Sequence, residues 1–336
     1  MDKKGFWKYS IVALSVFLLL AVSILLIWRK RPEAVNYARP AMGTLVEMTL
    51  MEGEKERFDE AVDAAFREIE RLEALLSSYR PDSDISRINR NAGKGPLPVS
   101  PDTFEVAKEA LRVAVLTDGA FDPTVGALAG VWGPSGEKGI VPSKEEVERL
   151  LGLVGYRGVM LDENAKSIAL AREGMSLNLG GVAKGYIIGN AAEELRARGV
   201  ARGIVRAGGD MVVFQDNGKP FTIGIKHPRK EGLLGELYIE NGAAPTSGDY
   251  ERFFEKDGVR YHHILDPRTG FPARGAQAVT LAAEDPTTAD ALATGVFVMG
   301  PARGMELIER LEGVEGLIVD EDGVARVSSG FKGRIY

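Results

Sequence analysis

The segment from His262 to Pro272 has the residue types most suited to chemistry in this 336-residue chain. It holds two of the three histidines, and Asp266 and Arg268 follow them closely. Histidine titrates near neutral pH, and the arginine guanidinium presents a fixed fork of donors that matches phosphate. The segment therefore predicts a polar loop that moves a proton or binds an anion.

A pair of glycines supplies a second candidate site. Gly180 and Gly181 end a short apolar run, and the helical pattern that follows carries Lys184 near its start. Glycines allow the backbone to approach a ligand, and the start of a helix offers free N–H groups with a partial positive charge. This pattern predicts a phosphate-binding turn, although an ordinary turn before a helix has the same sequence.

Two further segments offer oxygen ligands. Asp290 and Thr294 are spaced i,i+4 in a helical run, so they share one face. Asp210 closes an Ala-Gly-Gly-Asp tetrapeptide between two apolar runs. Carboxylate and hydroxyl oxygens suit Mg²⁺, a hard octahedral cation. The alternative is structural, namely a carboxylate near a helix start and a threonine bonded to the backbone.

With these segments in view, the chain resembles the ApbE-type FAD:protein FMN transferases, also called flavin transferases. The resemblance runs from about Arg39 to the C-terminus and rests on eight segments that occur in one order. These are 41–44 (Ala-Met-Gly-Thr), 78–89, 121–125, the turn 180–184, 207–210, 246–250 (Thr-Ser-Gly-Asp-Tyr), the loop 263–272 and 289–294.

The resemblance implies a magnesium site and an FAD site. For magnesium it assigns Asp290 and Thr294 as ligands, together with the carbonyl of Gly181 and the nearby carbonyl of Ala293. For FAD it implies a contact from Lys184. The other positions that match residues around the flavin and adenine are Met42, Tyr79, Ala120, Phe121, Asp122, Asn178 and Ile264. Many relatives carry Asp at the position of Asn178, so this contact is neutral here.

The phosphoryl transfer implied by the family requires a proton acceptor for the attacking hydroxyl. His263 and Asp266 are the candidates, and bracing of the loop is the alternative role for His263. Residues 266–270 also partly resemble the Asp-x-x-Thr/Ser-Gly sequence that these enzymes flavinylate. We interpret them as the enzyme's own loop, because no convincing acceptor motif is present.

Composition excludes several classes of function. The net charge of −6 and the absence of a basic block with interleaved aromatics in the soluble part argue against a nucleic-acid partner. The sequence contains no cysteine, which excludes disulfides, iron–sulfur clusters, thiolate zinc sites and a cysteine nucleophile.

The N-terminus predicts a membrane anchor. After a basic flank (1–10), residues 11–28 form an apolar run interrupted by two serines. As a helix this run is about 27 Å long, enough to cross a bilayer core. A cleaved signal peptide is the alternative. By the positive-inside rule, the lysines before the run favour a cytoplasmic N-terminus, whereas the basic residues 29–31 after it favour the opposite orientation. The family resemblance favours a single-pass inner (cytoplasmic) membrane protein with an extracytoplasmic catalytic domain.

The rest of the chain predicts an α+β fold, with mixed ApbE-like sheets and flanking helices. A linker is expected over 29–40, the transferase domain over 41–336 and a loop over 77–98. Helices are expected at 54–76, 102–117, 143–151, 182–198, 287–299 and 302–311 from apolar periodicity. Strands are expected at 44–50, 158–161, 167–171, 203–207, 221–225, 236–240, 278–283 and 316–319. Strands and helices do not alternate strictly, which favours α+β over α/β.

The predicted activity is Mg²⁺-dependent transfer of FMN from FAD to a threonine or serine of an acceptor protein, with release of AMP. The expected acceptors carry an Asp-x-x-Thr/Ser-Gly-Ala-Thr type of motif, as in subunits of membrane redox complexes. Two other functions are alternatives, and the first of them uses the same residues. A Mg²⁺-dependent FAD pyrophosphatase would replace threonine with water, and a noncatalytic flavin-binding protein would not require Lys184, Asp290 and Thr294.

Overall fold

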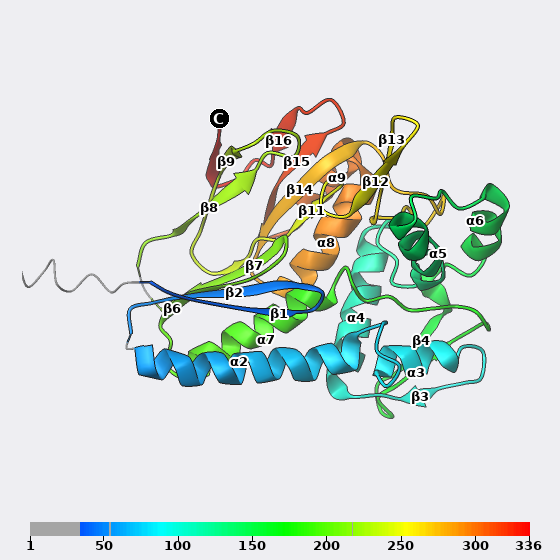
Figure 1. Ribbon diagram of the computed structural model, residues 1–336, viewed down its shortest axis with the longest axis horizontal. Helices are drawn as coiled ribbons and strands as arrows, with labels where there is room; N and C mark the ends of the chain where they lie inside the picture. Colours follow the sequence, from blue (N-terminus) through cyan, green and yellow to red (C-terminus); the bar gives the residue numbers. More distant parts are fainter. Residues whose placement is uncertain (1–33, 54, 217) are drawn as a thin grey trace, which may run out of the picture.

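The computed structural model describes residues 34–336 except 54 and 217. Its centre is a nine-stranded antiparallel sheet with the order β1-β2-β6-β7-β10-β14-β15-β16, and β11 also pairs with β14 (Figure 1). The strands are β1 (Val35–Ala41), β2 (Thr44–Met51), β6 (Arg202–Ala207), β7 (Asp210–Gln215), β10 (Gly242–Ala243), β11 (Thr246–Gly248), β14 (Ala276–Ala283), β15 (Val314–Asp320) and β16 (Ala325–Val327).

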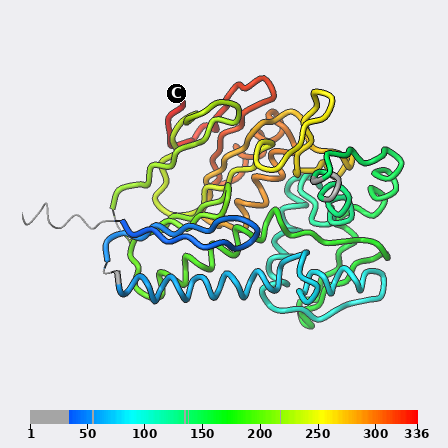
Figure 2. Tube along the Cα trace, in the orientation of Figure 1, coloured from blue at the N-terminus to red at the C-terminus, as the bar shows by residue number. Residues whose placement is uncertain are grey.

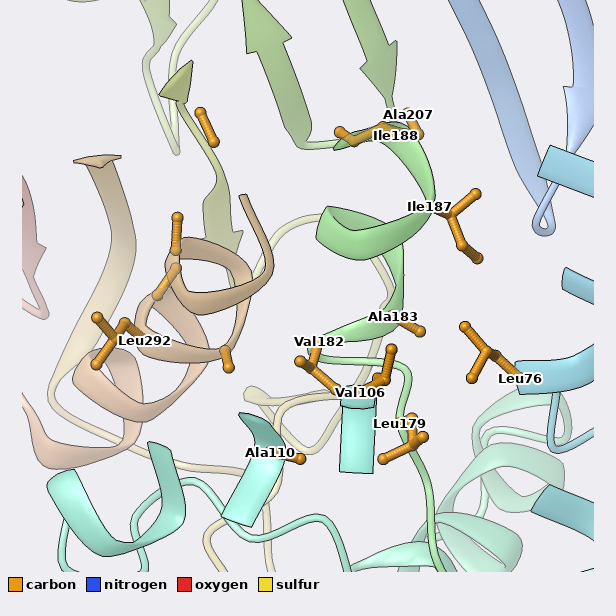
Figure 3. Close-up of a cluster of buried hydrophobic side chains, with 14 of the residues drawn as sticks. Leu76, Val106, Ala110, Leu179, Val182, Ala183, Ile187, Ile188, Ala207 and Leu292 are labelled. Atoms are coloured by element: carbon orange, nitrogen blue, oxygen red, sulfur yellow. The ribbon is translucent and has the colours of Figure 1, made fainter. Parts of the chain in front are cut away.

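Helices cover one face of this sheet. The helices of the described residues are α2 (Lys55–Leu76), α3 (Asp84–Arg90), α4 (Pro101–Leu116), α5 (Gly126–Glu137), α6 (Lys144–Leu151), α7 (Ala183–Ala197), α8 (Pro286–Met299) and α9 (Pro301–Arg310), of which α5 and α6 lie to one side of the sheet (Figure 1). α7 packs on β6 and β7, α8 on β14, and α9 on β15, while α2 lies outside α7. Figure 3 shows Ala183 and Ile187 of α7 directed towards Leu76 of α2 in this core.

A small sheet covers the opposite face. It consists of β17 (Gly333–Ile335), β9 (Leu233–Ile239) and β8 (Phe221–Lys226), in that order. Alternation along β7 connects the two layers: Val212 and Phe214 pack on the helices, whereas Met211 and Val213 pack on the small sheet. Every residue of β7 is therefore buried.

The remaining elements form the periphery. A second small sheet contains β3 (Leu97–Pro98), β5 (Ser167–Leu170) and β4 (Val159–Asp162), preceded by a 3-10 turn at Tyr156–Gly158. β12 (Phe253–Lys256) and β13 (Val259–His262) form a hairpin. This hairpin packs on α5 and α6 through aromatic side chains, with Trp132 stacked on Tyr261 at a centroid distance of 5.8 Å.

Mixed antiparallel sheets with flanking helices confirm the predicted α+β class. Two expected loop regions are wrong in part. Residues 35–40 of the expected linker belong to the edge strand β1, which pairs with β2 and runs along α2 (Figure 2). The expected loop 77–98 contains α3, because Ser83 caps its start and Ile85 and Ile88 are buried. α5 was also not predicted, since it is rich in glycine.

The predicted membrane helix at 11–28 lies outside the described residues. Over 34–336 without 54 and 217, no helix has the length and hydropathy needed to cross a bilayer.

Candidate functional site

The start of α7 and the first turns of α8 lie in direct contact because Gly185 has no side chain. A Cβ on Gly185 would stand 2.0 Å from the carbonyl oxygen of Pro286 and 2.8 Å from the Cβ of Asp290. The N–H of Gly185 donates to Asp290 Oδ2 at 2.9 Å. The glycine thus fixes Asp290 beside the residue that precedes it, Lys184.

Lys184 lies between two buried carboxylates. Its Nζ donates to Asp210 Oδ2 at the start of β7, and Asp210 and Asp290 are each only 3% exposed. Burial by itself lowers the pKa of Lys184, but the charges of Asp210 and Asp290 outweigh it and keep the lysine protonated. Desolvation and the charge of Asp210 raise the pKa of Asp290, against the opposing effect of Lys184. One lysine therefore serves two carboxylates, and negative charge is in excess.

Hydroxyl oxygens lie further along α8 and on the neighbouring strand β11. Thr294 lies one turn along α8, and its Oγ1 is 3.3 Å from Ser247 Oγ on β11. Gly181 lies against the same threonine, since its Cβ would stand 3.2 Å from Thr294 Oγ1. Ala293 is fully buried within α8. The structure thus places Gly181 against Thr294, one helical turn along α8 from Asp290.

The donor set suits magnesium better than zinc. Among the described residues, no three His, Cys, Asp or Glu side chains form a group that could hold a metal. The available ligands are instead one carboxylate beside hydroxyl and carbonyl oxygens, and excess negative charge lies next to them. Mg²⁺ prefers this chemistry and keeps several waters or phosphate oxygens as further ligands.

Phe121 connects the glycine turn to α8. Its Cε2 would be 3.3 Å from a Cβ on Gly181, and its own Cβ would be 3.2 Å from one on Gly295. Ala120 and Phe121 are 3% and 4% exposed, so they form the wall of the site more than its surface.

Asp122, which we expected near FAD, supports this wall. Its Oδ1 accepts the N–H of Thr124 at 2.8 Å and the hydroxyl at 2.6 Å, while Oδ2 accepts the N–H of Tyr156 at 2.8 Å. Burial nevertheless raises the pKa of Asp122, against these hydrogen bonds. The carboxylate holds the segment that carries Ala120 and Phe121.

Asn178 and Met42 shape the backbone at other edges. Asn178 Oδ1 accepts the N–H of Gly180 at 2.8 Å, so the side chain holds the glycine turn. Met42 has φ 52° at the tip of the β1–β2 hairpin, a left-handed conformation that is strained for this residue. Its N–H donates to Glu73 Oε2 at 3.0 Å. Tyr79, in contrast, is 89% exposed, which leaves its ring open to a ligand.

The two adjacent histidines have different surroundings. His262 is buried, with its Nε2 2.9 Å from the carbonyl oxygen of Ala273. His263 keeps an exposed surface, although surrounding protein desolvates the ring. This desolvation lowers the pKa of His263 to about 4, and nearby positive charge on Arg252 and Lys184 acts in the same direction. At neutral pH the imidazole is therefore uncharged and able to accept a proton.

The carboxylate of Asp266 accepts its hydrogen bonds from its own loop. Its Oδ1 accepts from the Nε of Arg268 at 2.8 Å and from the backbone N–H at 2.9 Å, and Oδ2 accepts a further guanidinium N–H at 2.9 Å. Ile264 between the histidine and this loop is buried. Of the two predicted proton acceptors, His263 is thus the more exposed.

Comparison with known proteins identifies the family of this chain. The ApbE family profile matches residues 42–318. The chain belongs to the ApbE family. A relative from Vibrio cholerae named FAD:protein FMN transferase is 34% identical over 335 residues, which covers 96% of this chain and 97% of the relative. A relative of the same name from Klebsiella pneumoniae is 32% identical and covers 85% and 89%.

Solved ApbE structures have the same fold. The ApbE protein from Thermotoga maritima superposes with a TM-score of 0.82 at 37% identity, over 88% of this chain and 97% of that one. The flavin transferase ApbE from Vibrio cholerae gives 0.76 at 31% identity, over 89% and 98%.

Two contacts of this ApbE site are not predicted by the sequence. Asp210 ends the Gly-Gly-Asp segment that the sequence singles out, but only the fold places it on Lys184, 26 residues earlier. Ser247 lies in the Thr-Ser-Gly-Asp-Tyr segment and reaches Thr294 because β11 pairs with β14 beside α8. In both cases the sequence contains the motif but does not indicate the contact, with Lys184 for Asp210 and with Thr294 for Ser247.

Proposed function

We propose that this FAD:protein FMN transferase uses Mg²⁺ and moves FMN from FAD to a threonine or serine hydroxyl of an acceptor protein, with release of AMP. One observation carries the proposal: two desolvated carboxylates share a single lysine beside the Thr294 hydroxyl. Such an excess of buried negative charge is costly unless a cation joins it. The family's transferase activity accounts for the flavin part.

Asp290, Thr294 and the carbonyl of Gly181 would hold the Mg²⁺, with the carbonyl of Ala293 nearby. The bound ion would neutralise charge on the diphosphate of FAD. Lys184 would contribute a further positive charge, held in place by Asp210. Phe121, Ala120, Met42, Tyr79, Asn178 and Ile264 are the proposed surroundings of FAD.

In the proposed reaction, the acceptor hydroxyl oxygen attacks the phosphorus on the FMN side of the diphosphate. A new P–O bond to the acceptor forms, the P–O bond to the AMP phosphate breaks, and AMP leaves. The hydroxyl proton goes to His263, which is uncharged at neutral pH because its pKa is lowered. No nucleophile from this chain is needed, since positioning and charge stabilisation supply most of the catalysis.

The test uses the full-length protein with FAD, Mg²⁺ and an acceptor domain carrying an Asp-x-x-Thr-Gly-Ala-Thr motif. Intact-mass measurement should show FMN added to this domain and no addition to a matched domain with alanine in place of the first threonine. AMP release should be slow without acceptor and rise sharply with it. AMP release that is equally fast in both conditions, with no protein gaining FMN, would instead establish an FAD pyrophosphatase.

We further propose that residues 11–28 anchor the enzyme in the inner membrane, with the catalytic domain outside the cytoplasm and near subunits of membrane redox complexes. The run has the length and apolar character of a membrane span. Alkaline extraction of native membranes should leave the full-length chain in the pellet, and protease added to spheroplasts should digest it. A mature N-terminus near residue 30 would show that the segment is cleaved.

A further inference from the structure

Arg252 lies opposite His263 at the open end of the β12–β13 hairpin. The hairpin register pairs Phe253 with His262, and the N–H of His263 donates to the carbonyl oxygen of Arg252 at 3.1 Å. Side chains at directly opposed positions of two strands lie on the same face. Both side chains are exposed, so the guanidinium and the imidazole are presented together.

The guanidinium also reaches the other side of the site. One of its terminal nitrogens lies 3.9 Å from the position that a Cβ on Gly43 would take, beside Met42 at the tip of the β1–β2 hairpin. The charge of Arg252 disfavours protonation of both His263 and Lys184, so it acts on the centre of the site. Arg252 thus lies between the β12–β13 and β1–β2 hairpins, beside the predicted proton acceptor His263.

Arg252 differs from neighbouring arginines in having no side-chain partner among the described residues. Arg229 forms a bidentate ion pair with Asp249, and Arg260 pairs with Glu255 and lies over the ring of Phe253. Within the described part of the chain, Arg252 forms no ion pair and its side chain donates no hydrogen bond. Its donors are available to a ligand.

The charges of the site require a second cation. When both are ionised, Asp210 and Asp290 carry two negative charges, and Lys184 offsets one of them. A diphosphate brings two more negative charges, which a single Mg²⁺ balances. One negative charge then remains, and Arg252 offsets it. The planar guanidinium fork also matches phosphate oxygens in geometry, unlike an ammonium group.

We propose that Arg252 binds the diphosphate of FAD through its guanidinium, as a second cation beside Lys184. The inference rests on the proposed function, since it takes FAD as the substrate of this site. Arg252 is a catalytic residue in this account, because it touches the phosphates between which the bond breaks.

The variants Arg252→Met and Arg252→Lys separate charge from geometry. A hydrogen bond between charged groups contributes enough that Arg252→Met should weaken FAD binding about 10- to 100-fold. Arg252→Lys should recover part of this loss, because it restores the charge without the fork. Riboflavin has the ring system and no phosphate, so its affinity should stay unchanged in both. Arg303→Met is the matched control, since Arg303 is a half-exposed arginine on α9 that pairs with Asp118 at 3.7 Å.

Equilibrium dialysis without acceptor measures the affinity of the full-length protein for FAD and for riboflavin. Transfer assays then give kcat and the KM values for FAD and for the acceptor. Selective loss of FAD affinity in Arg252→Met, with Arg303→Met like the wild type, is the expected result. Equal losses of FAD and riboflavin, or an increase in the KM of the acceptor alone, would overturn the inference. The second result would assign the guanidinium to a carboxylate of the acceptor. A wild-type protein that transfers no FMN would refute the proposed function instead.

Discussion

Two buried carboxylates of this protein, Asp84 and Asp290, have opposite surroundings. Asp84 is 5% exposed and receives Arg87 at 2.8 Å, the N–H of Ser100 at 2.8 Å and the hydroxyl of Thr103 at 3.0 Å. Asp290 is 3% exposed and receives one backbone N–H, while Asp210 takes the hydrogen bond of the nearest lysine. The first charge is compensated within the fold, and the second is not.

This difference separates a carboxylate that stabilises the fold from one reserved for a ligand. Removing a compensated buried charge leaves its donors unpaired and costs stability. Removing an uncompensated one relieves repulsion and desolvation, so the fold loses little. Natural sites accept such local instability because function requires it. The predictions below set these two regions against each other.

The largest expected effect is on catalysis, in Asp290→Asn. Loss of a charged ligand should reduce FMN transfer about 10²- to 10³-fold at saturating FAD. Without Mg²⁺ the same variant should be about 1 to 2 kcal/mol more stable than the wild type, because the repulsion from Asp210 is gone. Initial rates by intact mass and urea unfolding by circular dichroism measure the two effects. A variant that transfers FMN normally at limiting Mg²⁺ would show that the metal site is assigned wrongly.

The reverse pattern is expected for Asp84→Asn. The amide keeps the volume but loses the charge that receives Arg87, Ser100 and Thr103, so stability should fall by about 2 kcal/mol. FMN transfer per folded molecule should stay within about twofold of the wild type, because α3 and α4 only support the site. A large loss of turnover in the fully folded variant would contradict the separation of the two regions.

The sequence predicts the helices and strands around the site better than it predicts which residues contact each other inside the site. The helices α2, α4 and α6 to α9 and the strands β2, β6 and β14 lie within a few residues of their expected positions, because long apolar periodicity marks them. α5 escapes prediction because its glycines lack helix propensity, and burial of Leu128 and Trp132 holds it instead.

The site residues were found mostly through resemblance to ApbE proteins, since a Gly-Gly pair or an Asp/Thr spacing is common. Periodicity contains no information on which carboxylate meets Lys184, and that contact depends on how β7 and α8 flank α7. No sequence motif indicates that the guanidinium of Arg252 is available to a ligand. Only the register of its hairpin places it beside His263.

His262 and His263 differ in the same way, one expected to support the fold and the other to act in the reaction. Both have lowered pKa values, mainly because burial disfavours the charged ring. If His263 takes the acceptor proton, kcat/KM at saturating Mg²⁺ should hold down to about pH 5 and fall below it, since its pKa is about 4. His263→Gln should lower transfer across the whole range, whereas His262→Gln should keep the pH profile and lose about 1 kcal/mol of stability.

The same pKa values set the pH dependence of folding. Both folded-state values lie below the unfolded value of about 6.5, so the unfolded chain binds more protons under that pH. The associated stability is complete above about pH 6.5 and should decline as the pH falls towards the folded values. Urea midpoints between pH 5 and 8 measure this slope, and His262→Gln should reduce it. An acid limb of kcat/KM near pH 6.5 that persists in His263→Gln would assign this titration to another group, such as Asp290, whose pKa is raised to about 7.

The smallest effect is expected at Glu73, a carboxylate that holds the edge of the site. It receives the N–H of Met42, whose left-handed backbone is strained. Glu73→Ala should cost about 1 kcal/mol of stability and raise the KM for FAD a few-fold. Met42→Gly removes the strain, so the same Glu73→Ala change in that background should cost less. Equal costs in the two backgrounds would show that Glu73 does not support this turn.

The most direct test of the central claim measures the metal itself. Mn²⁺, a spectroscopic substitute for Mg²⁺, is titrated into full-length wild type, Asp290→Asn and Asp84→Asn in the presence of FAD, and bound ion is read by electron paramagnetic resonance. The uncompensated charge at Asp290 predicts one site in the wild type and in Asp84→Asn, and at least tenfold weaker binding in Asp290→Asn. Equal Mn²⁺ affinity in all three proteins would contradict the account.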